Sequence, residues 1–190
     1  MKRFFALGIA TVAIVASAGM ARAEFFDSRD IFGGGPNFYQ GGVSPIPRET
    51  VMFQGQYAPG TIIVSTGERR LYLVLPNGQA LRYGIGVGRV GFTWAGTTSV
   101  VAKKEWPDWT PPSQMLKRRP DLPRFMKGGP ENPLGARAMY LGSSLNRIHG
   151  SNEPETIGQA VSSGCFRLLN DDVIDLYGRV KVGAKVIVMR

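Results

Sequence analysis

From Gly60 onward, short runs of β-branched and aromatic residues alternate with segments rich in glycine and proline. Runs of this kind favour β-strands, and the residues between them favour turns. Pro76-Asn77-Gly78 is a turn signal between two such runs, which predicts an antiparallel meander. We expect strands at residues 61–66, 70–75, 79–85, 98–103, 136–141 and 184–189.

One segment has the features of a helix, residues 171–180. Asp171 and Asp172 suit the start of a helix because they complement its positive end. The apolar residues that follow have helical spacing: Val173, Leu176, Tyr177 and Val180. Many short strands with one short helix predict a mainly β fold, an antiparallel β sandwich or half-open barrel.

Residues 105–133 are too long for an ordinary connection. They are basic and contain several prolines and the turn Gly128-Gly129-Pro130, so regular structure is not expected. Two interpretations stay open. The segment is a functional lid, or it is a solvated loop whose Trp106 and Trp109 pack on the core.

The first 23 residues resemble a cleaved export signal. Basic residues precede an apolar run at residues 4–18, and Ala21-Arg22-Ala23 is a small-x-small cleavage site. A retained anchor is the alternative, but the run is shorter than the ~20 residues that span a bilayer. Residues 24–58 are predicted to be a flexible leader rich in glycine and proline. Residues 59–190 are predicted to be a single domain.

The chain is basic, with 23 lysines and arginines against 14 acidic residues and a formal net charge of +9. Removal of the predicted signal lowers this charge to +6, because that segment holds three basic residues and no acidic one. A basic exported protein is drawn to anionic partners such as a cell-wall polymer or a membrane face. Export makes nucleic acid the least expected partner.

The chain has one cysteine, Cys165, and one histidine, His149. A disulfide needs two thiols and a zinc site of Cys and His ligands needs three or four, so neither forms within this chain, and no metal or cofactor is expected. An unpaired thiol in an exported protein is either buried and inert or kept for chemistry. A thiol beside an imidazole can transfer acyl groups, although the spacing alone does not show that the two meet.

Both residues lie in the stretch HGSNEPETIGQAVSSGCFRLLNDDV, residues 149–173. This stretch resembles the signature of the bacterial L,D-transpeptidase family with its YkuD-type catalytic domain, and residues 59–190 as a whole are similar to that domain. The resemblance implies an enzyme of the periplasm that acts on peptidoglycan stem peptides.

The resemblance also implies catalytic roles. Cys165 corresponds to the nucleophile that takes the acyl group from a stem tetrapeptide and releases its terminal D-alanine. His149 corresponds to the general base and acid, and Gly150 to the residue whose backbone carbonyl orients the imidazole. Carbapenems, which inhibit this family, would acylate the same thiol.

Four more positions match the motif and are candidate substrate-binding residues: Ser163, Gly164, Arg167 and Asn170. Some members carry a second histidine where this chain has Ser163. Asn170 has an alternative role as a loop or cap residue. Arg167 has an alternative role in a structural ion pair with an acid of the next segment, Asp171, Asp172 or Asp175.

The acyl acceptor is left open by the motif. A second stem peptide, a lysine of an outer-membrane protein, a free D-amino acid and water are all possible acceptors, and water would make the enzyme hydrolytic. A catalytically silent peptidoglycan-binding module and a structural β sandwich with a buried free cysteine are the alternatives from other classes.

Overall fold

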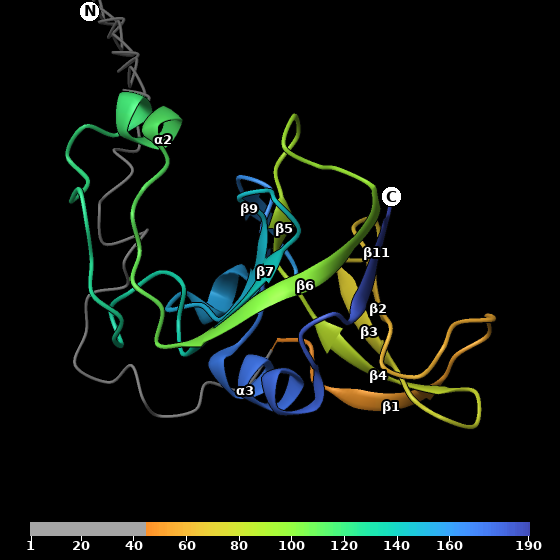
Figure 1. The fold of residues 1–190 in the computed structure, drawn as a ribbon. Helices are drawn as coiled ribbons and strands as arrows, with labels where there is room; N and C mark the ends of the chain where they lie inside the picture. Colours follow the sequence, from red (N-terminus) through yellow and green to blue (C-terminus); the bar gives the residue numbers. More distant parts are fainter. Residues whose placement is uncertain (1–44) are drawn as a thin grey trace, which may run out of the picture.

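The computed structural model describes residues 45–190 (Figure 1). The predicted signal and residues 24–44 of the predicted leader lie outside the described residues. One sheet of nine strands forms the body of the domain, in the order β1-β4-β3-β2-β11-β6-β7-β8-β10, and a second sheet contains β5 and β9. The strands are β1 (Glu49–Met52), β2 (Ile62–Ser65), β3 (Arg70–Val74), β4 (Gln79–Gly84), β5 (Val87–Gly88), β6 (Gly96–Glu105), β7 (Arg137–Leu141), β8 (Arg147–His149), β9 (Ala160–Ser162), β10 (Phe166–Arg167) and β11 (Lys185–Met189).

The mainly β fold and the antiparallel meander are confirmed. β2, β3 and β4 pair in sequence order, with Ile62 opposite Leu73 and Leu71 opposite Tyr83. The strands expected near residues 98–103, 136–141 and 184–189 are present as β6, β7 and β11. β6 is longer than expected at both ends and forms the long strand that crosses Figure 1.

Three strand pairs are parallel, which the expectation of an antiparallel sheet did not include. β11 inserts between β2 and β6 and runs parallel to β2, while β8 pairs in parallel with β10 and β5 with β9. The chain returns to the sheet in each case through a helix or loop, and such crossovers are what parallel neighbours require.

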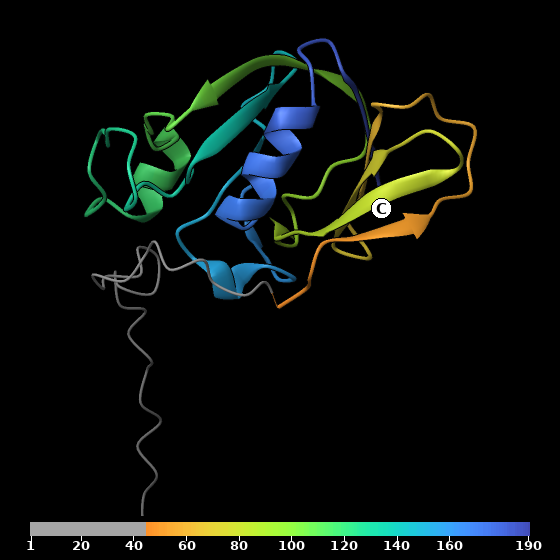
Figure 2. The same cartoon turned by 90° about the horizontal axis from the view of Figure 1, so that it is seen from below.

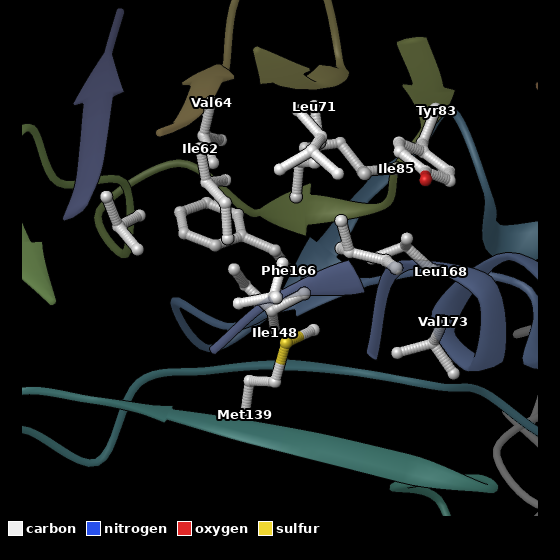
Figure 3. Packing of buried hydrophobic residues seen from close by; sticks show 14 of the residues in the cluster. Ile62, Val64, Leu71, Tyr83, Ile85, Met139, Ile148, Phe166, Leu168 and Val173 are labelled. Atoms are coloured by element: carbon white, nitrogen blue, oxygen red, sulfur yellow. The ribbon is translucent and has the colours of Figure 1, made fainter. Parts of the chain in front are cut away.

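The main hydrophobic core lies between two halves of the curved sheet, the meander β2–β4 and the half that contains β6, β7, β8 and β10. Figure 3 shows Ile62 and Leu71 of the meander facing Met139 and Ile148 of the other half, with Phe166 between them. All five side chains are fully buried or nearly so. Ile148 lies on β8 and Phe166 lies on β10, so the packing of these two side chains in the core fixes the position of both strands.

The predicted helix is confirmed as α3 (Asn170–Arg179). Figure 2 shows α3 lying across the sheet between the β6–β7 half and the meander. Val173 and Leu176 are buried on the inward face, and Val180 follows at the end of the helix. The spacing of these three residues is the amphipathic pattern from which the helix was predicted.

The expectation that residues 105–133 lack regular structure is wrong in part. A short helix, α2 (Ser113–Arg118), forms directly after Pro111 and Pro112 of this segment, and a single turn η1 (Pro154–Thr156) lies in the motif. Proline is tolerated just before a helix because the N–H groups of the first turn need no intrahelical partner. Trp109 packs in a separate small core with Leu122 and Leu134, so this tryptophan stabilises the segment itself.

The sheet begins before residue 59, where the domain was expected to start. β1 lies inside the predicted leader and pairs antiparallel with β4, with Thr50 opposite Leu81. Just before it, Arg48 forms an ion pair of 3.2 Å with Asp175 of α3. No helix among residues 45–190 is long and apolar enough to cross a membrane.

Candidate active site

The parallel pair β8 and β10 brings the motif histidine and cysteine to neighbouring strands. Phe166 lies opposite Ile148, and Arg167 lies opposite His149. Side chains alternate along a strand, so the row of His149 and Arg167 lies on the face opposite to the buried Phe166 and Ile148. Cys165 directly precedes β10 and is two residues from Arg167, which places the thiol on that same face.

A tight turn presents Cys165. Gly164 has φ of +112°, a region that favours glycine. The hydroxyl of Ser162 donates to the Cys165 carbonyl at 2.6 Å and accepts from the Gly164 N–H at 3.2 Å. The indole N–H of Trp94 donates to the Gly164 carbonyl at 2.9 Å, and its ring packs on Phe166. These contacts hold the half-buried thiol at the corner between turn and strand.

His149 is 4% exposed, and its Nδ1 lies 2.5 Å from the Gly150 carbonyl oxygen. The Gly150 N–H donates to the Arg137 carbonyl of β7 at 3.0 Å, which fixes the turn after β8. A carbonyl oxygen only accepts, so Nδ1 carries the proton and the neutral ring has its lone pair on Nε2.

Asn170 supports this turn from behind. Its Oδ1 accepts from the Ala136 N–H at 2.9 Å, and a Cβ at Gly150 would lie 2.3 Å from the same oxygen. Asn170 therefore closes the space beside Gly150 and ties the start of α3 to the residue before β7.

Burial favours the neutral forms of both His149 and Cys165. Burial and the neighbouring Arg167 and Arg147 guanidinium groups lower the pKa of His149 to about 3, against the opposing effect of the Gly150 hydrogen bond. Burial raises the pKa of the Cys165 thiol, and hydrogen bonds and charge from Arg147 oppose the rise. The thiol of Cys165 and the imidazole of His149 are therefore both neutral at neutral pH.

Arg167 has a partner that differs from the three acids expected for its ion pair. Its Nη1 lies 2.5 Å from Oε2 of Glu153, and the side chains are 18% and 5% exposed. Glu153 is four residues after His149 in the motif, and burial raises its pKa while Arg167 lowers it. The pairing needs the chain to fold back through η1, which the sequence alone did not indicate.

Arg147 was not identified from the sequence, and the contacts of Ser163 could not be determined from it. Arg147 precedes His149 by two residues on β8, so alternation along a strand was the signal that could have identified it. The hydroxyl of Ser163 is buried and has no hydrogen-bond partner among residues 45–190.

Residues 59–188 match the sequence model of the YkuD L,D-transpeptidase catalytic domain. The match covers more than half of the chain, and the chain belongs to this family. It is similar to the probable L,D-transpeptidase ErfK/SrfK of Escherichia coli K12, with 40% identity over 134 residues. That alignment spans 66% of this chain and 42% of the relative, so the chain covers less than half of that protein's length.

Solved structures agree on the fold. L,D-transpeptidase 3 of Mycobacterium tuberculosis, in complex with a faropenem-derived adduct, has a TM-score of 0.56 at 17% identity, over 68% of this chain and 60% of that one. A Brucella melitensis structure is 45% identical, with a TM-score of 0.52 over 76% of this chain and 94% of that one. The Brucella protein is described as a probable carnitine operon oxidoreductase. This description differs from the transpeptidase family to which the present chain belongs.

Proposed function

We propose that this protein is an exported peptidoglycan L,D-transpeptidase in which Cys165 forms a thioester with the donor peptide. The observation that carries the proposal is the arrangement of the two unique residues. Cys165 precedes β10, His149 ends the adjacent strand β8, and Gly150 holds the imidazole with Nε2 as its basic nitrogen. A nucleophile beside a base that a third group orients is the arrangement that acyl transfer requires.

The first half of the reaction forms the acyl-enzyme. The Cys165 sulfur attacks the carbonyl carbon of the third stem residue as its proton passes to Nε2 of His149. Because both groups are neutral beforehand, proton transfer accompanies the attack. The bond to the D-alanine nitrogen then breaks, His149 returns the proton to that nitrogen, and D-alanine leaves with a thioester at Cys165.

The second half transfers the acyl group. An acceptor amine attacks the thioester, His149 takes the amine proton, and the thiol leaves with that proton. A second stem peptide gives a direct cross-link between stem peptides, and a lysine of an outer-membrane protein gives an attached protein. Water as acceptor makes the protein a carboxypeptidase or a detaching enzyme of the same fold.

The remaining motif residues have supporting roles in this proposal. The Ser163 hydroxyl, which has no partner among the described residues, donates to the bound donor peptide. Gly164 allows the turn that exposes the thiol. Arg167 and Asn170 hold the substrate-facing segments in place, since their side chains are engaged with Glu153 and with the Ala136 N–H.

The proposed location is the periplasm. The signal-like residues 1–23 support export, and the positive charge that remains after their removal suits an anionic cell wall. We also propose that carbapenems acylate Cys165. The faropenem-derived adduct of the M. tuberculosis relative supports a reaction of a β-lactam with this fold.

The test is incubation of the purified protein with disaccharide-tetrapeptides, with product masses compared between the wild type and Cys165→Ser. The proposal predicts release of D-alanine by the wild type only, and the mass of the second product identifies the acceptor. Release that persists in Cys165→Ser would contradict the nucleophile, and tight peptidoglycan binding without turnover by either protein would support a binding module.

A further inference from the structure

We propose that Arg147 is an anion-binding residue beside the nucleophile, which selects donor peptides that carry a free carboxylate next to the bond that Cys165 attacks. The inference rests on the proposed function, since it names the chemical group that the same site recognises. Arg147 lies two residues before the motif stretch 149–173.

The strand register places Arg147 next to the thiol. Phe166 lies opposite Ile148 in the parallel pair, so the residues before them, Cys165 and Arg147, are also neighbours across the two strands. Both lie on the face opposite to the core, because the side chains of Phe166 and Ile148 are buried. His149 is next along the same face of β8.

The contacts of Arg147 confirm this placement. Its Nη1 donates to the Leu145 carbonyl at 3.1 Å, and the Cys165 thiol lies 3.8 Å from the same oxygen. The guanidinium stacks 5.2 Å from the ring centroid of Tyr140, its partner on β7. The Leu145 side chain is 69% exposed, so this corner of the site borders solvent.

Among the residues that the structure describes, no acidic group neutralises the charge of Arg147. No carboxylate among residues 45–190 forms an ion pair with it, and its buried Nε has no hydrogen-bond partner there. Arg167, the other guanidinium on this face, is paired with Glu153 at 2.5 Å. Of these two arginines, Arg147 is therefore the one with charge and donor capacity left for a ligand.

The donor peptide supplies a matching group. In a tetrapeptide, only the amide nitrogen and one α-carbon separate the scissile carbonyl from the terminal carboxylate. When that carbonyl lies against the Cys165 sulfur, the carboxylate lies within reach of a neighbouring guanidinium. Charge-assisted hydrogen bonds of this kind are among the stronger ones in proteins. A donor with a further residue or a terminal amide places a neutral group there.

The first test does not depend on transpeptidation. Iodoacetate and iodoacetamide alkylate the same thiol, and the ratio of their rates with one protein cancels the thiolate fraction. We expect Arg147→Gln to lower the iodoacetate-to-iodoacetamide ratio about tenfold relative to the wild type. Lys185→Gln, which removes one exposed positive charge from β11, should leave the ratio unchanged. An equal ratio in Arg147→Gln and the wild type would overturn the proposal.

The second test uses tetrapeptides that end in a carboxylate or in an amide. The wild type should prefer the carboxylate about tenfold or more in kcat/KM, Arg147→Gln should lose the preference mainly through KM, and Arg147→Lys should restore part of it. A preference that survives in Arg147→Gln contradicts the anion-binding role. If the wild type turns over neither peptide, the proposed function fails, while the alkylation ratio still decides the role of Arg147.

Discussion

The Nδ1 atom of His149 lies 2.5 Å from the carbonyl oxygen of Gly150, the next residue in the chain. In the proposed mechanism, this contact takes the place of the acidic residue that orients the imidazole in many triads. A carbonyl oxygen carries no full charge, so it raises the basicity of the ring less than a carboxylate does. Burial therefore dominates, and the pKa of His149 falls to about 3.

The depressed pKa of His149 predicts a loss of stability in acid. The unfolded chain protonates this residue near 6.5, whereas the folded protein holds it neutral to about 3. The unfolded state thus binds more protons in this window, and the free energy of unfolding falls as the pH drops from 6.5 towards 3. Urea midpoints at several pH values should show a smaller acid loss for His149→Gln than for the wild type. If the urea midpoints of the two proteins fell equally with decreasing pH, the result would contradict a neutral, buried imidazole at His149.

The Glu153–Arg167 pair predicts a position where one carboxylate matters to stability. Glu153→Ala leaves a largely buried guanidinium without its partner, and we expect a loss of about 3 kcal/mol in the free energy of unfolding. Glu155→Ala, an exposed acid of the adjacent turn η1, is the matched control and should change stability little. Denaturant unfolding measures both, and equal effects of the two variants would remove the special role of Glu153.

The turn at Gly164 predicts a position that does not tolerate a side chain. Gly164→Ala places a Cβ 2.9 Å from the Asn146 side-chain oxygen in a left-handed conformation, so we expect a loss of about 1–2 kcal/mol and a lower rate of D-alanine release. Gly178→Ala in α3 meets no atom within 4 Å, and it should instead stabilise by about 0.5–1 kcal/mol. Thermal melts and activity assays of this pair separate the turn from a general effect of alanine.

The proposed thiol chemistry predicts a single covalent adduct with a carbapenem. Intact mass should increase once by the mass of the drug in the wild type, and not in Cys165→Ser. Because burial raises the pKa of the thiol, iodoacetamide alkylation in the absence of drug should continue to accelerate above pH 9, the ordinary value for cysteine. A wild type that remains unmodified by carbapenem would mean that the thiol is not activated by its surroundings.

The meander and α3 could be predicted because their signals are local. Residues 61–85 alternate runs and turns with little interruption, and Val173, Leu176 and Val180 have helical spacing. β8, β9 and β10 could not be found this way, since strands of two or three residues are too short to show a period. Their pairing is set by the core contacts of Ile148 and Phe166.

The candidate site residues could be named from the motif, but their partners in space could not. Cys165 and His149 both belong to the motif and lie on or next to the paired strands β8 and β10, whereas the partner of Arg167 could be found only from the structure. Three acids follow Arg167 closely in the sequence, but the chain reverses through η1 and brings Glu153 to it. Arg147 was missed because the alternation that relates it to His149 requires strand β8, which is too short to be predicted from the sequence.

The most direct test of the account is detection of the acyl-enzyme. The wild type is mixed with disaccharide-tetrapeptide without acceptor, quenched in acid, and examined by intact mass and peptide mapping. We predict an added mass equal to the donor minus D-alanine, located on Cys165 and removed by hydroxylamine, as a thioester requires. Release of D-alanine with no adduct at Cys165, or with an adduct elsewhere, would contradict the account.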